Sequence, residues 1–202
     1  MTKAMLFDLG NVLVAFDFRR GYEAIRPYCR VPAGEIQPRI TQSGLVPPYE
    51  RGKISSQEFF ERLAAVLEMQ VTYEEFCRLW STIFLPDVLV PEAMLQGLRR
   101  RYRMVLISNT NDIHYRDIAS RYAIVTHFDA HVLSYEVGAA KPEDPIYLEA
   151  IRQAGCAPDE CLYIDDIPEF IAAGRRHGLA AVQFQNAVEL ETELQRRGVV
   201  WR

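Results

Sequence analysis

Three short apolar segments, each followed at once by polar residues, constrain the fold of this 202-residue chain most strongly. They are residues 4–7 before Asp8, residues 104–107 before Ser108, and residues 161–164 before Asp165 and Asp166. Each segment lacks polar alternation, which is typical of a strand buried on both faces of a parallel sheet. Weaker candidates for strands lie at 130–134 and 180–184.

Helical patterns separate these strands in the second half of the chain. Asp144 is predicted as the N-cap of one helix, because a proline follows it at the first helical position. A second helix is predicted to begin at Pro168, and residues 112–121 and 187–197 supply two more. Alternation of strands and helices predicts an α/β fold with a doubly wound parallel sheet. Because ligands bind beyond the carboxyl ends of such strands, the polar residues that end them are expected to meet in one crevice.

The stretch from 17 to 91 is different, because it contains no good strand pattern. Two capping boxes, Ser55 with Glu58 and Thr72 with Glu75, each precede apolar residues at helical spacing. We interpret these apolar stripes as core packing rather than ligand contacts. The sequence therefore predicts a helical module at 17–91, inserted into a core formed by 1–16 and 92–202.

Composition and charge exclude several classes of protein. The chain has 23 basic and 27 acidic residues, and a net charge of −4 argues against a protein that mainly coats nucleic acid or anionic membrane. No apolar run approaches the ~20 residues that span a bilayer, and Asp8 and Asn11 interrupt the only stretch resembling a signal peptide. The four cysteines have no metal-binding spacing. We expect reduced thiols and a cytoplasmic protein, either a monomer or a weak homodimer.

Four motifs follow one another along the chain: FDLGNVL at 7–13, ISNTN at 107–111, GAAKP at 138–142 and YIDD at 163–166. Each is a weak signal alone, but in this order, with a helical insertion after the first, they resemble the haloacid dehalogenase superfamily of phosphotransferases. The resemblance extends over essentially the whole chain and implies a Rossmann-like core with a small α-helical cap of type C1. The first two motifs look like those of the bacterial branch that contains α-D-glucose-1-phosphate phosphatase.

The resemblance implies a phosphatase acting on a small phosphorylated metabolite. Asp8 is the implied nucleophile, forming an aspartyl-phosphate that water then hydrolyses. Lys141 is expected to pair with Asp8 and to bring positive charge to the phosphoryl group. The Ser108 hydroxyl and the backbone N–H of Asn109 are expected to bind the phosphate oxygens.

The resemblance also implies Mg²⁺ as the cofactor, bridging Asp8 and a phosphate oxygen. The further ligands implied are the backbone carbonyl of Gly10 and a carboxylate from Asp165 or Asp166. Adjacent carboxylates repel each other and need either a cation or positions on separate faces. Which of the two carboxylates contacts the metal directly stays open.

Gly10 departs from the pattern of most phosphatases in the superfamily, where a second aspartate acts as general acid and base. General acid–base catalysis typically contributes about 10²–10⁴ in rate. An anomeric or acyl oxygen leaves more readily than a primary alkoxide, so we predict a preference for sugar 1-phosphates or acyl phosphates. Asp17 is a candidate replacement acid, although a hinge or cap role is favoured. Phe170 stands where an asparagine commonly supports the metal-site loop.

Residues 49–53 lie between the predicted cap helices. They form either a specificity loop facing the site or, as we favour, a turn before a helix.

Two other functions stay open. A hydrolytic haloacid dehalogenase also uses an aspartate nucleophile and lacks the second aspartate, but it needs no metal, and the Asp165–Asp166 pair argues against it. A non-catalytic metabolite-binding protein on the same fold is the other alternative. The presence of both Asp8 and Lys141 weakens that interpretation.

Overall fold

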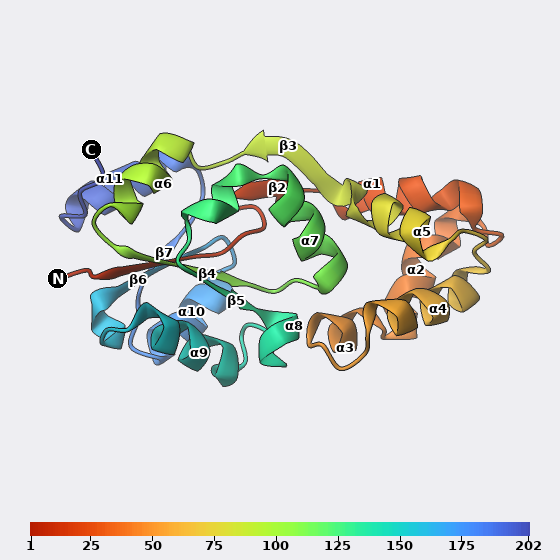
Figure 1. Cartoon of the computed structure of the whole chain (residues 1–202). Helices are drawn as coiled ribbons and strands as arrows, with labels where there is room; N and C mark the ends of the chain where they lie inside the picture. The colour runs from red at the N-terminus through yellow and green to blue at the C-terminus, as the bar shows by residue number, and fades with distance from the viewer.

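A five-stranded parallel sheet lies at the centre of the larger half of the molecule (Figure 1). The computed structural model describes residues 1–202. In spatial order the strands are β5 (Ala130–Leu133), β4 (Arg103–Ser108), β1 (Ala4–Phe7), β6 (Cys161–Asp165) and β7 (Ala180–Gln183). β1 is central and pairs in parallel with β4 on one side and β6 on the other. The predicted α/β fold and all five predicted strands are confirmed.

Helices cover both faces of this sheet, as Figure 1 shows. Met5 and Phe7 of β1 pack in one apolar cluster, and Ala4 and Leu6 pack in another. The first cluster includes residues of α6 (Glu92–Arg99), α7 (Asp112–Arg121) and α11 (Ala187–Arg196). The second includes residues of α9 (Asp144–Ala154) and α10 (Pro168–Arg176). Burial on both faces explains why the strands show no polar alternation.

The N-cap prediction for Asp144 is wrong by one residue. α9 begins at Asp144 itself, and Glu143 occupies the N-cap position without a side-chain capping bond. The Glu143 carboxylate instead accepts hydrogen bonds from Arg51 and from the backbone N–H of Ala140. The Asp144 carboxylate lies 3.1 Å from Nε2 of His177. Both carboxylates therefore bind groups outside the first turn of α9, and neither of them caps the helix.

The inserted helices form a second body with its own apolar cluster. They are α1 (Phe18–Ile25), α2 (Ala33–Ser43), α3 (Val46–Glu50), α4 (Ser56–Leu67) and α5 (Tyr73–Trp80), with short 3₁₀ turns η1 (Arg26–Tyr28) and η2 (Ser81–Ile83). The hydroxyls of Ser55 and Thr72 accept the predicted capping bonds at 3.1 and 3.2 Å. Phe59 and Phe76 are fully buried, so the apolar stripes are core packing.

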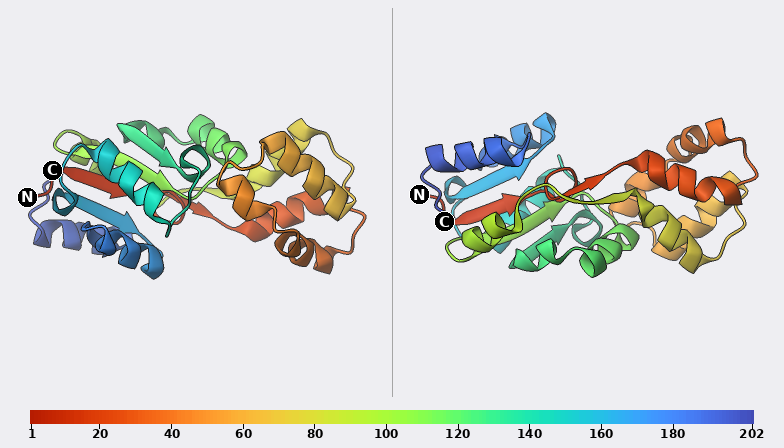
Figure 2. Two further views of the ribbon diagram at one scale, coloured as in Figure 1. Left: turned by 90° about the horizontal axis from the view of Figure 1, so that it is seen from below. Right: turned by 90° about the horizontal axis from the view of Figure 1, so that it is seen from above.

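Two strands between the cap and the core form a narrow antiparallel ribbon. β2 (Val14–Phe16) pairs with β3 (Phe84–Val88), and both views in Figure 2 show the chain passing between the two bodies along them. The expectation of no strand within 17–91 is therefore wrong. Pro86 and Asp87 disfavour strand structure in the sequence, but an edge ribbon tolerates them.

A second contact between the two bodies lies on the opposite side of the cap. There the turn after α3 meets α8 (Ser134–Val137), and Nη2 of Arg51 lies 2.6 Å from the Glu143 carboxylate. The remaining 3₁₀ turns are η3 (Ala123–His127) and η4 (Pro158–Glu160). All four cysteines are free thiols. None of the helices combines the length and apolar character that crossing a membrane requires.

Candidate active site

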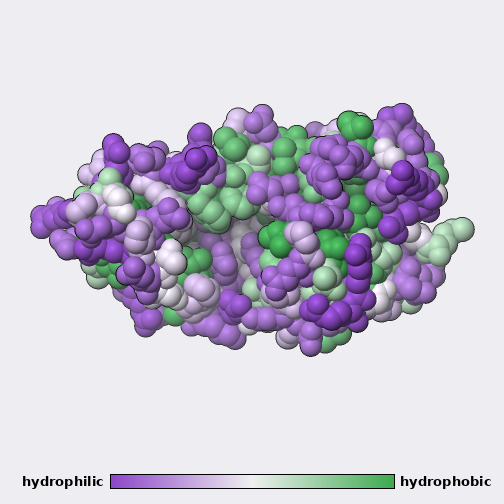
Figure 3. All heavy atoms as spheres, turned by 180° about the vertical axis from the view of Figure 1, so that it is seen from behind, coloured by the Kyte–Doolittle hydropathy of each residue, from purple (hydrophilic) through white to green (hydrophobic).

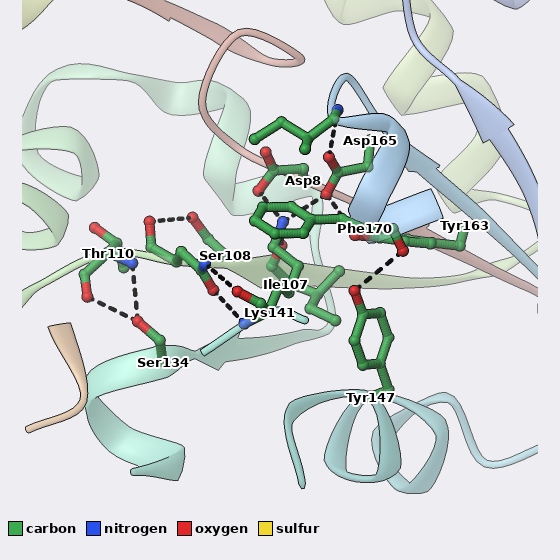
Figure 4. A network of polar contacts seen from close by, with 12 residues as sticks. Asp8, Ile107, Ser108, Thr110, Ser134, Lys141, Tyr147, Tyr163, Asp165 and Phe170 are labelled. Atoms are coloured by element: carbon green, nitrogen blue, oxygen red, sulfur yellow. Dashed lines mark hydrogen bonds and ion pairs between the residues drawn. The ribbon is translucent and has the colours of Figure 1, made fainter. Parts of the chain in front are cut away.

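The carboxyl ends of β1, β4 and β6 bring the polar residues predicted from the sequence together (Figure 4). Asp8 directly follows β1, Ser108 ends β4 and Asp165 ends β6. All three are buried. Because neighbouring parallel strands end at the same edge, three segments far apart in the sequence supply one site.

Lys141 links the two buried carboxylates of this site. Its ammonium Nζ lies 2.8 Å from Oδ1 of Asp8 and 2.6 Å from Oδ2 of Asp165, and it donates a third bond to the Ile107 carbonyl at 3.3 Å. Lys141 is 3% exposed and Asp165 is 0% exposed. At this depth a charge is tolerated only when it is paired. The expected pairing of Lys141 with Asp8 is therefore present in the structure.

Burial and pairing act against each other on the acid–base properties of this centre. Burial raises the pKa of Asp8, the Lys141 ammonium lowers it and the Asp165 carboxylate raises it, and together these influences place it at about 7. Burial alone lowers the pKa of Lys141, but the two carboxylates outweigh it and hold that pKa above its usual value. The lysine therefore stays charged and favours the ionised form of Asp8.

Asp165 is held by more contacts than the sequence suggested. Its Oδ1 accepts the backbone N–H of Ile167 at 2.9 Å, and its Oδ2 accepts the Tyr163 hydroxyl as well as Lys141. Sequence reasoning missed Tyr163 as a member of the site. Its position two residues before Asp165 on the same strand places both side chains on one face, which is the signal that could have identified it.

The carboxylates can hold a divalent cation. Oxygen atoms of Asp8, Asp165 and Asp166 lie within 4.8 Å of one another. Three carboxylates against one ammonium leave an excess of negative charge at a buried site, and oxygen ligands suit Mg²⁺. Asp165 already accepts three hydrogen bonds, whereas the Asp166 side chain accepts none from the protein. Burial, followed by the Asp165 charge, raises the pKa of Asp166.

Asn109 connects the second motif to the lysine loop. Its side-chain amide donates to the Lys141 carbonyl at 2.9 Å and accepts the Lys141 backbone N–H at 2.7 Å. The adjacent Thr110 is fixed in a similar way, because its N–H donates to the Ser134 hydroxyl at 2.9 Å and its carbonyl accepts from it. The sequence indicated only a backbone role for Asn109, so these side-chain bonds are additions. These bonds join the segment that follows Ser108 to the separate loop that carries Lys141, and so fix the two residues relative to each other.

Phe16 occupies the space beside Gly10. A Cβ atom at Gly10 would lie 2.6 Å from Cε1 of the Phe16 ring, well inside contact distance. A second aspartate at this position would require the ring to move. The neighbouring Asp17 does not supply the missing group: it is the N-cap of α1, and its carboxylate pairs with Arg19 at 2.8 Å. Hydrogen bonds from Arg19 lower the pKa of Asp17, the opposite of what a general acid requires.

Phe170 lies over the lysine rather than supporting the metal-site loop. The centroid of its ring is 5.0 Å from Nζ of Lys141, and its carbonyl accepts the Tyr147 hydroxyl at 3.1 Å. An aromatic face at this distance attracts an ammonium. Phe170, which stands where an asparagine is common, therefore places its aromatic ring against the Lys141 ammonium (Figure 4).

The cap contributes one wall of a pocket beside the charged centre. Glu50 at the end of α3 lines this pocket together with Gly10, Phe16, Ser108 and Asn109. Seen from behind, the molecular surface is hollowed between the cap and the core (Figure 3). The residues after Glu50 form a turn before α4, as favoured from the sequence. The alternative also has support, because Glu50 itself faces the pocket.

A model of the haloacid dehalogenase-like hydrolases matches residues 2–178 of the chain. The chain therefore belongs to this family of hydrolases. It is 28% identical over 200 residues to D-ribitol-5-phosphate phosphatase of Bacteroides thetaiotaomicron, covering 96% of this chain and 97% of that protein. It is 30% identical over 187 residues to a phosphatase of Mycobacterium tuberculosis, covering 88% of this chain and 85% of the relative.

The fold is also similar to that of a solved relative. A haloacid dehalogenase family enzyme from B. thetaiotaomicron, crystallised with magnesium and inorganic phosphate, superimposes with a TM-score of 0.82 at 26% identity. The match covers 92% of this chain and 96% of the other. The predicted family and the Rossmann-like core are thus confirmed.

Proposed function

We propose that the protein is a Mg²⁺-dependent phosphatase that hydrolyses a small phosphorylated metabolite through an aspartyl-phosphate on Asp8. The observation that carries this proposal is the position of Lys141 between Asp8 and Asp165, beside a third carboxylate. A phosphate dianion repels an anionic nucleophile, so attack by a carboxylate requires positive charge at the site, which the Lys141 ammonium supplies and a bound cation would increase. The named phosphatases among the relatives support the same chemistry.

The residues of this chain divide the reaction between them. Lys141 holds Oδ1 of Asp8, which leaves the other carboxylate oxygen to attack phosphorus. Ser108 and the backbone N–H of Asn109 bind the phosphate oxygens, and the ammonium of Lys141 stabilises the charge on the transferring group. The P–O bond to the substrate breaks, and water then cleaves the aspartyl-phosphate to release phosphate and free Asp8. Asp8, the Gly10 carbonyl and Asp165 or Asp166 would hold Mg²⁺, which would supply further charge neutralisation.

The finer part of the proposal is a preference for sugar 1-phosphates. Phe16 fills the space in which a second carboxylate would begin, and Asp17 is engaged by Arg19. Without an acid at either position, substrates with a readily leaving oxygen are favoured. D-ribitol 5-phosphate, named for a relative, is instead a primary-alcohol ester, so the two types of ester belong in one assay.

Phosphate release from glucose 1-phosphate, glucose 6-phosphate, D-ribitol 5-phosphate and acetyl phosphate tests both levels of the proposal. We expect turnover that requires Mg²⁺, stops in EDTA and is highest for glucose 1-phosphate and acetyl phosphate. Equal turnover of the two glucose phosphates would overturn the preference alone. Halide release from a 2-haloacid, unaffected by EDTA, would favour a dehalogenase. Tight binding of an ester without turnover would favour a binding protein.

The protein is expected to act alone on this substrate, with no nucleic acid or membrane partner. A monomer or a weak homodimer is proposed, and analytical ultracentrifugation of the purified chain tests it.

A further inference from the structure

Glu50 is the only charged side chain lining the pocket between the cap and the core. Ser108 and Asn109, the proposed phosphate-binding residues, line one part of this pocket. The aromatic rings of Phe16 and Phe18 contribute to its apolar part. A phosphate ester bound at Ser108 would therefore extend its leaving group into a space that is lined by one carboxylate and three phenylalanine rings.

The Glu50 carboxylate has no partner within the protein. It makes no hydrogen bond and no ion pair, whereas Glu35 on the outer surface of the same cap pairs with Arg39 at 2.7 Å. The charge of the adjacent Arg51 lowers the pKa of Glu50, but less than burial raises it, and the guanidinium donates its hydrogen bonds to Glu143 and the Pro47 carbonyl instead. Glu50 is partly buried, and this burial raises its pKa. A partly buried carboxylate without a donor is destabilising, so a donor from a ligand would offset a real cost.

The two neighbours of Glu50 hold it in this position. The Tyr49 hydroxyl accepts the backbone N–H of Ile113 in the core at 3.2 Å, and its ring stacks on Phe59 with centroids 4.2 Å apart. On the other side, Arg51 is fixed to the core by its ion pair with Glu143. The backbone around Glu50 is therefore anchored to the core on both sides, which directs one unpaired acceptor into the pocket.

The chemistry of this pocket points to one kind of leaving group. A carboxylate accepts hydrogen bonds from hydroxyl groups and repels a second phosphate or carboxylate, and aromatic rings pack against the C–H faces of a sugar or polyol. We propose that Glu50 is a specificity-determining residue that binds the hydroxyl groups of a neutral, polyhydroxylated leaving group and excludes substrates with a second anionic group. This inference rests on the proposed phosphatase function.

Steady-state kinetics of Glu50→Ala, Glu50→Gln and the matched control Glu61→Gln test the proposal. Glu61 is an exposed cap glutamate that binds only Gln57. The substrates are glucose 1-phosphate, D-ribitol 5-phosphate, glucose 1,6-bisphosphate and p-nitrophenyl phosphate, which has no hydroxyl groups. For the better of the two polyhydroxylated monophosphates, we expect Glu50→Ala to lower kcat/KM by about 10-fold to 100-fold, mainly through KM, as loss of a hydrogen bond to a charged group predicts.

The other substrates separate recognition from other roles. Turnover of p-nitrophenyl phosphate should stay within about twofold in all variants, and Glu50→Gln should improve kcat/KM for the bisphosphate because the repelling charge is gone. A fall in kcat for every ester with KM unchanged would overturn the proposal, as would a Glu50→Ala variant whose kcat/KM is unchanged for both polyhydroxylated monophosphates. If the wild-type protein hydrolyses no ester at all, the phosphatase function itself fails.

Discussion

The carboxylates in the charged centre of the core are paired, whereas the carboxylate in the pocket beneath the cap is unpaired. In the core, Asp8 and Asp165 share the ammonium of Lys141, and backbone and tyrosine donors complete the bonds to Asp165. In the pocket, Glu50 has no partner at all. Pairing fixes the geometry of the groups that we propose for the reaction. An unpaired acceptor, in contrast, is available to a ligand, so the difference separates reaction chemistry from recognition.

The two regions also come from different parts of the fold. The proposed reactive groups lie at the ends of buried strands, where both faces of the sheet are covered by helices. Glu50 comes from α3, a helix of five residues in the inserted cap. The core can thus keep one reaction while the cap is free to vary in the leaving groups that it accepts.

The largest expected effect comes from removing the nucleophile with Asp8→Asn. An amide does not attack phosphorus, so phosphate release should fall by at least about 10⁴-fold. Binding of inorganic phosphate should be retained, because the Ser108 and Asn109 loop is unchanged. Phosphate release and phosphate binding by calorimetry measure the two effects. A rate within about 10-fold of the wild type would show that the core is not the reactive region.

Removing the shared ammonium with Lys141→Met tests how strongly the core depends on pairing. Two buried carboxylates would then face each other without a counter-charge, which should destabilise the fold by about 3–5 kcal/mol. The rate should fall by about 10²–10³-fold because charge on the transferring phosphoryl group is no longer stabilised.

Urea unfolding with and without Mg²⁺ provides the control for Lys141→Met. Bound Mg²⁺ should recover more stability in the variant than in the wild type, because the cation replaces part of the missing charge. Equal stabilisation of both proteins by Mg²⁺ would contradict the view that these carboxylates share one cation site.

Most of the core site could be predicted from the sequence, whereas the contribution of the cap to the pocket was only the less favoured of two alternatives for residues 49–53. Asp8, Ser108 and Asp165 end apolar strands, and strand ends meet at one edge of a parallel sheet by geometry alone. Glu50 becomes significant only through its position opposite Gly10 and Ser108, which depends on how the cap packs on the core. The pairing of β2 with β3 escaped prediction for a related reason, since Pro86 and Asp87 conceal a ribbon that tertiary contacts stabilise.

Acidification should weaken the contact that His114 of the core makes with Trp80 of the cap. This buried histidine accepts a hydrogen bond from the Asn111 amide at Nδ1 and donates from Nε2 to the Trp80 carbonyl at 3.2 Å, so it is neutral. Burial lowers the pKa of His114 to about 4. In the unfolded chain the pKa is about 6.5, so the unfolded state binds more protons between these values and stability is lost as the pH falls through this range.

A His114→Gln variant isolates this titration from that of the carboxylates. Between pH 7 and pH 5 the wild type should lose about 2 kcal/mol more of its free energy of unfolding than the variant does. Urea unfolding at the two pH values measures the difference. If both proteins lose the same amount, His114 does not couple the junction to pH.

The smallest expected effect comes from removing a single hydroxyl that donates to the charged centre, compared with a hydroxyl that donates beside it. Tyr163→Phe removes the hydroxyl that donates to Asp165, but Asp165 keeps its bonds to Lys141 and to the Ile167 N–H. We expect a loss of about 1 kcal/mol in stability and a fall in kcat of about three-fold to ten-fold, with little change in KM. Tyr147→Phe is the matched control, because its hydroxyl donates to the Phe170 carbonyl and touches no carboxylate. The control should lose similar stability with kcat unchanged. An equal fall in kcat for both variants would mean that Tyr163 supports packing alone, and that the pairing of Asp165 depends on Lys141 and the backbone.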